Sequence, residues 1–181
     1  MFKILDEVCT PKRGTKYSAY VDLFAREDIT IGAGETKIVK LGVKIDLDKL
    51  KSNWINKSGL IFEPIEAKKT LIEFGFNHFL KSHYLEVALR SSLGVKGLII
   101  ANGIGIIDLD YPDEIGLIVH NPINLNFICD YLANNDYKKY SNFIIKKGDK
   151  VAQCTLKEHK SYLMGYESDV LRTGGFGSTG K

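Results

Sequence analysis

Short apolar runs alternate with polar turn residues along most of the chain, a pattern typical of a protein built from many short β-strands. The pattern predicts strands over residues 29–31, 37–47, 84–89, 98–107, 115–119 and 151–156. Turn residues separate these runs, as at Gly32-Ala33-Gly34 and Tyr111-Pro112-Asp113. Because few segments carry a helical period, we predict an all-β fold, either a sandwich or a barrel.

Three segments depart from this pattern. Residues 48–82, 35 residues in all, do not resemble a strand, and their second half predicts a short helix or an irregular flap. Residues 122–147 are rich in Asn, Tyr and Lys and predict an elaborated loop and hairpin. The final nine residues contain four glycines, so we expect a flexible C-terminal arm over residues 170–181.

Composition and charge indicate an ordinary globular chain. Apolar residues make up 44% of the 181 residues, enough for a core without metals or disulfides, so we predict one domain over residues 1–181. The net charge of +3 is too weak to indicate nucleic-acid binding but is compatible with small anionic ligands. No apolar run reaches the ~18 residues of a membrane helix, and the N-terminus is too acidic for a signal peptide. We therefore expect a cytoplasmic protein that binds neither nucleic acid nor membranes.

The cysteines and histidines do not suggest a metal centre. Cys9, Cys129 and Cys154 lie far apart and form no CxxC pair, which argues against a zinc site or a disulfide framework. We expect buried, inert thiols. The four histidines also lack the spacing of metal ligands.

Five motifs occur in an order that resembles the trimeric dUTPase family, the dUTP pyrophosphatases. They are AYVDLFA at 19–25, RSSLGVK at 90–96, NGIGIIDLDY at 102–111 continuing to Glu114 and Asn121, GDKVAQ at 148–153, and RTGGFGSTG at 172–180. One such motif is weak evidence, but five in order are highly specific. The resemblance covers residues 19–47 and 83–181.

The resemblance implies that water attacks the α-phosphorus of dUTP and that pyrophosphate leaves, which limits uracil in DNA and supplies dUMP. Asp108 matches the aspartate that orients the water and helps to deprotonate it. An ionised carboxylate is an acceptor-only group suited to this role, and a general base contributes about 10²–10⁴-fold in rate. Asp110 is expected on the same strand face as Asp108 and is interpreted as structural.

The same resemblance implies contacts to the base and the sugar. Asn102 matches the residue that reads the uracil edge, because its amide both donates and accepts. Tyr111 matches the aromatic that packs under the deoxyribose and excludes a 2′-hydroxyl, and Phe176 matches the lid over the uracil. The other implied substrate contacts in these motifs are Ser92, Ile106, Ile107, Gly177 and Ser178.

Further residues match contacts to the phosphates. Arg90 and Ser91 resemble donors to the phosphates and the leaving group, Gln153 a phosphate or water contact, and Arg172 the γ-phosphate clamp. The resemblance also implies Mg²⁺ held mainly by the three phosphates and water, with no direct protein ligand and with Asp22 contacting it through water.

The chain departs from the family pattern at several positions. Leu89 replaces a usual Pro, Ser92 a usual Gly and Lys150 a common Arg, and Arg172 is one residue closer to Phe176 than expected. The insertion at 48–82 enters where the family has a short turn. It could cap the site, pack on the trimer, bind a protein partner or have no catalytic role. Because a surface insertion that carries no core costs little closure entropy, we expect that deleting residues 48–82 and closing the gap with a short turn leaves a folded, active enzyme.

Two alternative functions stay open. The first is a dCTP deaminase or a bifunctional deaminase–dUTPase, which needs a catalytic Glu where this chain has Ile118. The second is a nucleotide-responsive regulatory protein that acts through residues 48–82. The dUTPase resemblance implies a distorted jelly-roll subunit (β-clip) in a homotrimer, with dUTP sites shared between subunits and the C-terminal arm crossing to a neighbour.

Overall fold

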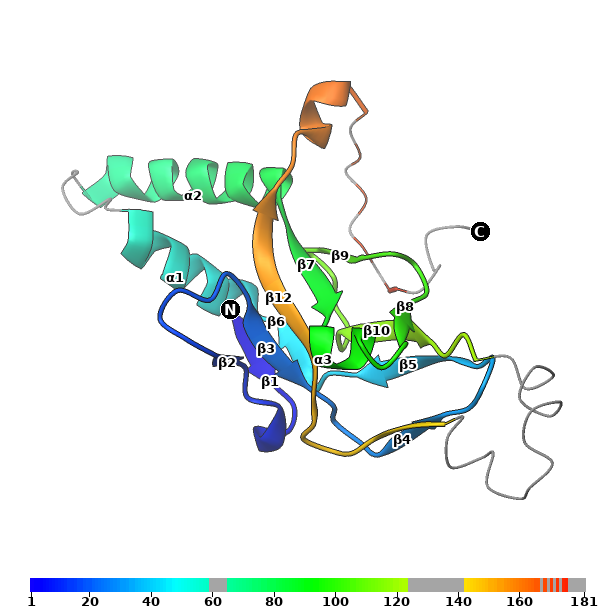
Figure 1. Cartoon of the computed structure of the whole chain (residues 1–181). Helices are drawn as coiled ribbons and strands as arrows, with labels where there is room; N and C mark the ends of the chain where they lie inside the picture. The colour runs from blue at the N-terminus through cyan, green and yellow to red at the C-terminus, as the bar shows by residue number, and fades with distance from the viewer. Residues whose placement is uncertain are drawn as a thin grey trace, which may run out of the picture.

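Antiparallel strands are the commonest regular elements in the computed structural model of this chain (Figure 1). The structure describes residues 1–58, 65–123, 142–166, 168, 170, 172, 174 and 175, with the side chains of 65–68 left out. The strands are β1 (Phe2–Ile4), β2 (Lys12–Arg13), β3 (Val21–Phe24), β4 (Ile29–Ile31), β5 (Thr36–Lys40), β6 (Val43–Ile45), β7 (His83–Leu89), β8 (Ile99–Ile100), β9 (Gly105–Asp108), β10 (Gly116–His120), β11 (Phe143–Ile145) and β12 (Lys150–Glu158). The helices are α1 (Leu47–Ser58), α2 (Ile65–Ser82) and α3 (Ser91–Gly94), with 3₁₀ turns η1 (Glu7–Cys9) and η2 (Ser161–Met164). The fold is mostly β, which confirms the coarse class; the all-β prediction did not include helices α1 and α2.

The strands form two larger sheets and two strand pairs. One sheet has the order β2-β3-β12-β7-β9 and the other β5-β10-β8, while β1 pairs with β6 and β11 with β4. Predicted strands 29–31, 84–89, 115–119 and 151–156 are found within about a residue or two at each end. The predicted run 37–47 is broken into β5 and β6, and the run 98–107 into β8 and β9, which join different sheets.

The five-stranded sheet separates the core from the face that carries polar chemistry. Cross-strand neighbours share a face, so Val87 on β7 and its partner Cys154 on β12 both point into the core. The residues next to these along each strand point to the other face. There, Gln153 pairs with Asp22 and Ala88, and Glu86 pairs with Ile106. Asp22, Gln153, Ile106 and Asp108 therefore lie on the opposite face from this core.

Two cysteines lie within the described residues, and both are free and buried, as expected. Burial raises the pKa of Cys154 to about 12, so its thiol stays protonated at neutral pH. Cys129 lies outside the described residues. The described helices include none that is long and apolar enough to cross a membrane.

Residues 47–82 contain two substantial helices where the sequence predicted one short helix or a flap (Figure 1). Leu50 of α1 and Phe76 of α2 are almost fully buried and join the main hydrophobic core. Trp54 packs against Phe76 with ring centroids 5.9 Å apart. The two helices therefore contribute to the core. Deletion of residues 48–82 would remove core side chains, so the expectation that this segment can be deleted without loss of folding is wrong.

Phe76→Ala is expected to reduce the free energy of unfolding by about 3–5 kcal/mol, because it removes a buried ring and leaves a cavity. For a chain of this size, each kcal/mol lowers Tm by about 2–4 °C. The matched control is Phe74→Ala on the same helix, where the ring is 76% exposed and the change should stay within about 0.5 kcal/mol. Thermal melts of both variants test this, and equal Tm values would contradict it.

Candidate active site

A pocket of about 170 Å³ lies where β9, β10 and the loop between β8 and β9 meet. Its walls contain five of the predicted substrate residues, which are Asn102, Ile106, Ile107, Tyr111 and Arg172. The other lining residues, Gly105, Gly116, Leu117 and Ile118, were not predicted as contacts. These residues are glycines and aliphatic residues, so their chemistry does not mark them in the sequence as substrate contacts.

Tyr111 forms an almost fully buried wall of this pocket. Its ring belongs to the hydrophobic core, and its hydroxyl lies 3.5 Å from the backbone oxygen of Glu114. Burial raises the pKa of Tyr111, so the phenol stays neutral. The backbone of Gly175 lies so close to the ring that a Cβ there would overlap it. The ring gives the pocket a flat apolar surface, which suits a sugar ring.

Asp108 ends β9 beside this pocket, and its side chain is 59% exposed. The Arg172 guanidinium donates to its carboxylate and lies over the Tyr111 ring, 5.1 Å from the ring centroid. Arg172 is held in turn through Nε, which donates to the Gly174 oxygen at 2.8 Å. Asp108 is thus an accessible, ionisable group at the rim of an apolar pocket.

The expectation for Asp110 is wrong. β9 ends at Asp108, and the Tyr111 N–H donates to the Asp108 backbone oxygen at 3.0 Å, which closes a turn. Asp110 therefore lies in that turn and not on the strand face of Asp108. This turn is what brings Tyr111 back toward the pocket.

The phosphate residues form a second cluster around Asp22, which is 6% exposed. Arg90 donates to one Asp22 oxygen, and Lys150 Nζ lies 3.1 Å from the other. Gln153 stands opposite Asp22 in the pairing of β12 with β3. Lys150, which replaces a common Arg, thus still supplies a cation here. Ser91 and Ser92 are exposed at the start of α3.

Asp108 and the second cluster lie near opposite ends of β7. Asp108 pairs with Tyr84 at the start of β7, and Arg90 follows Tyr84 by six residues. At ~3.3 Å per residue, about 20 Å separates the two backbones. Asp108 and Arg90 of the same chain therefore do not lie side by side on this sheet. Predicted contacts Phe176, Gly177 and Ser178 lie outside the described residues.

The donor groups do not form a metal cage. Within the described ranges, no three His, Cys, Asp or Glu side chains are arranged to hold a metal ion. Both oxygens of Asp22 face cations, which leaves that carboxylate poorly placed as a direct ligand. This donor set fits a metal held mainly by a bound polyphosphate.

Comparisons with known proteins agree with this geometry. No family model matches the chain. It is 30% identical to the deoxyuridine 5′-triphosphate nucleotidohydrolase of Rickettsia felis, over 94% of this chain and 87% of that protein. The fold resembles the dUTPase of Streptococcus mutans (TM-score 0.54, 21% identity, 87% of this chain and 94% of that one). It also resembles the dUTPase of phage phi11 of S. aureus (TM-score 0.58, 18% identity, 98% and 97%), a mutant of which coordinates a structural Mg(II) ion. On the Rickettsia identity, the chain belongs to the deoxyuridine 5′-triphosphate nucleotidohydrolase family, the dUTPases.

Proposed function

We propose that this chain hydrolyses dUTP to dUMP and pyrophosphate. The observation that carries the proposal is Asp108, an exposed carboxylate at the rim of a pocket lined by Asn102 and Tyr111. Asp108 orients a water toward the α-phosphorus and accepts a proton from that water as it attacks. The amide of Asn102 pairs with the uracil edge. In this proposal the triphosphate displaces Arg172 from Asp108, and Arg172 then pairs with phosphate.

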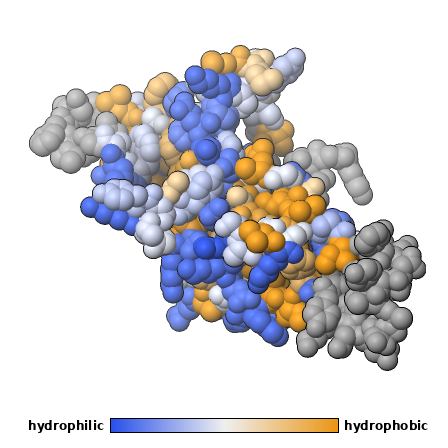
Figure 2. All heavy atoms as spheres, viewed as in Figure 1, coloured by the Kyte–Doolittle hydropathy of each residue, from blue (hydrophilic) through white to orange (hydrophobic). Residues whose placement is uncertain are grey.

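The phosphate contacts come from another chain in this proposal. Arg90, Ser91 and Gln153 of one subunit face the pocket of a neighbour. Within one subunit, Arg90 lies about 20 Å and Gln153 about 13 Å from Asp108 along β7. A homotrimer of distorted jelly-roll subunits provides this arrangement. Exposed apolar residues support such an assembly: Figure 2 shows apolar residues gathered over β8, β9 and β10, where Ile99 and Ile106 are 46% and 60% exposed.

Mg²⁺ fits this site as a partner of the nucleotide. It would neutralise charge on the triphosphate as pyrophosphate leaves. Asp22 would orient a water of its hydration shell, since Arg90 and Lys150 already occupy the carboxylate.

Deamination is disfavoured by Ile118. The deaminase reading requires a glutamate at this position, and here an aliphatic side chain lines the pocket. An isoleucine can neither donate nor accept the protons that deamination moves.

Hydrolysis in ¹⁸O-labelled water tests the proposed point of attack. We expect the label in dUMP and unlabelled pyrophosphate, because water attacks the α-phosphorus. Label in pyrophosphate or in orthophosphate would contradict the proposed reaction. The control is the same incubation with Asp108→Asn.

Tyr111→Ala is expected to relax discrimination against UTP by about tenfold or more, because it removes the surface that excludes a 2′-hydroxyl. The matched control is Tyr111→Phe, which keeps the ring and should keep the discrimination. The measurement is kcat/KM for dUTP and UTP on variants with an intact thermal transition. An unchanged ratio in Tyr111→Ala would show that Tyr111 does not select the sugar.

A further inference from the structure

We infer that Glu114 is a positioning residue that fixes Tyr111 and thereby sets the preference for deoxyribose. This inference rests on the proposed function, because it concerns the same pocket. Glu114 does not line that pocket; it acts through the turn that joins β9 to β10.

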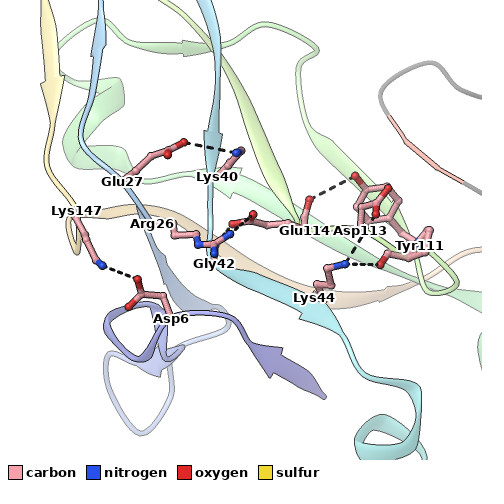
Figure 3. A network of polar contacts seen from close by, with 11 residues as sticks. Asp6, Arg26, Glu27, Lys40, Gly42, Lys44, Tyr111, Asp113, Glu114 and Lys147 are labelled. Carbon is pink, nitrogen blue, oxygen red and sulfur yellow. Dashed lines mark hydrogen bonds and ion pairs between the residues drawn. The ribbon is translucent and has the colours of Figure 1, made fainter.

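Glu114 connects this turn to two other parts of the fold (Figure 3). One carboxylate oxygen accepts from Arg26 Nη1 at 2.8 Å, and the other accepts from the Gly42 N–H at 2.8 Å. The Glu114 side chain is 15% exposed, so these charge-assisted bonds are well shielded from water. A carboxylate with both oxygens bonded to separate segments has little freedom to rotate or shift.

Both partners of Glu114 are themselves held in place. The Arg26 N–H donates to the Lys40 oxygen of β5 at 2.9 Å. Gly42 has a φ of 63°, and a Cβ there would overlap the Cys9 side chain, so glycine is required at this turn. We call these three residues the Arg26–Glu114–Gly42 clamp. It attaches the turn between β9 and β10 to the backbone beside β5.

Glu114 lies three residues from Tyr111, whose side chain lines two hollows. One is the nucleotide pocket, and the other also contains Arg26, Lys44 and Glu114. The turn is also tied by Lys44, which reaches the Pro112 oxygen at 3.2 Å from a more exposed position. Because the turn that carries Tyr111 borders this second hollow, loss of the clamp would let the ring shift relative to the sugar.

The second hollow is not proposed as an anion site, although three cations line it. Arg26 faces Glu114, Lys44 lies 3.9 Å from Asp113, and Lys40 lies 4.0 Å from Glu27. Each positive charge is matched, and the pairs made by Arg26 and Lys44 hold the turn.

The test measures kcat/KM for dUTP and UTP in Glu114→Ala and Arg26→Ala. A small displacement at a reacting site can cost up to about 100-fold, so we expect the dUTP-over-UTP ratio to fall by about tenfold in Glu114→Ala. Most of the change in this ratio should come from the KM values of the two substrates. The kcat for dUTP should stay within about threefold of the parent, because Asp108 is untouched. Arg26→Ala should give a smaller fall, since the Gly42 bond remains. The double variant should match Glu114→Ala, because both residues act as one unit.

The matched control is Glu27→Gln, which removes the neighbouring ion pair to Lys40 without touching the turn (Figure 3). Its ratio should equal that of the parent. If Glu114→Ala does not fold, Arg26→Ala decides, because Arg26 is 39% exposed and its loss leaves no cavity in the core. An unchanged ratio in a folded Arg26→Ala and Glu114→Ala, alongside a changed ratio in Tyr111→Ala, would overturn the clamp alone. A parent protein that releases no pyrophosphate from dUTP would instead overturn the proposed function and the clamp with it.

Discussion

Asp108→Asn is expected to lower turnover of dUTP by about 10²–10⁴-fold while nucleotide binding stays close to that of the parent. The amide keeps the size of the side chain but cannot accept a proton from the water. Asp108 is 59% exposed at the end of β9, so the substitution should not disturb the core. The loss should therefore appear in kcat and not in stability.

The matched control for this variant is Asp110→Asn. Asp110 is exposed in the adjacent turn, two residues from Asp108, and it does not line the pocket. It should keep turnover within about threefold of the parent, as surface substitutions usually do. Single-turnover kinetics and nucleotide titration of both variants test the assignment. Asp108→Asn within threefold of the parent would contradict it.

Mixing two inactive variants is expected to restore activity. Asp108→Asn lacks the water-orienting group, and Arg90→Gln lacks a phosphate donor but leaves Lys150 paired with Asp22. If each site takes Asp108 from one chain and Arg90 from another, random mixing at equal amounts gives about one quarter of the sites both groups. If each site lay within one chain, mixing would restore nothing.

A second pairing locates the C-terminal arm. Here Asp108→Asn is mixed with a chain that ends at residue 169 and therefore lacks Arg172. Recovery near one quarter would place the arm in a neighbour's site, as the resemblance implies. No recovery in this pair, together with recovery in the Arg90 pair, would mean that Arg172 serves the Asp108 of its own chain, the contact seen in this structure. Mixed oligomers are verified by mass in both experiments.

Several predicted substrate residues line one pocket because they lie close together in the chain. Asn102, Ile106, Ile107 and Tyr111 belong to β9 and the loops on either side of it, so a single sequence motif contains all four. The β7 and β12 strands were also predicted, since each is a short apolar run at 84–89 or 151–156 that is long enough to stand out in the sequence.

Features that depend on distant contacts were missed. α2 buries Phe76 on one side and exposes Leu71 and Phe74 on another, which obscures the apolar stripe by which an amphipathic helix is recognised. The Glu114 carboxylate bonds to groups 88 and 72 residues away in the chain, Arg26 and Gly42. Local patterns do not specify such partners, so the clamp became visible only in the folded chain.

Pyrophosphate release by the purified protein, measured with dUTP, dTTP, dCTP and UTP and with ammonia followed in parallel, tests the central claim most directly. The account predicts stoichiometric pyrophosphate from dUTP, at least about tenfold lower kcat/KM for the other three, and no ammonia from dCTP. Ammonia from dCTP, or equal pyrophosphate release from dUTP and UTP, would contradict it.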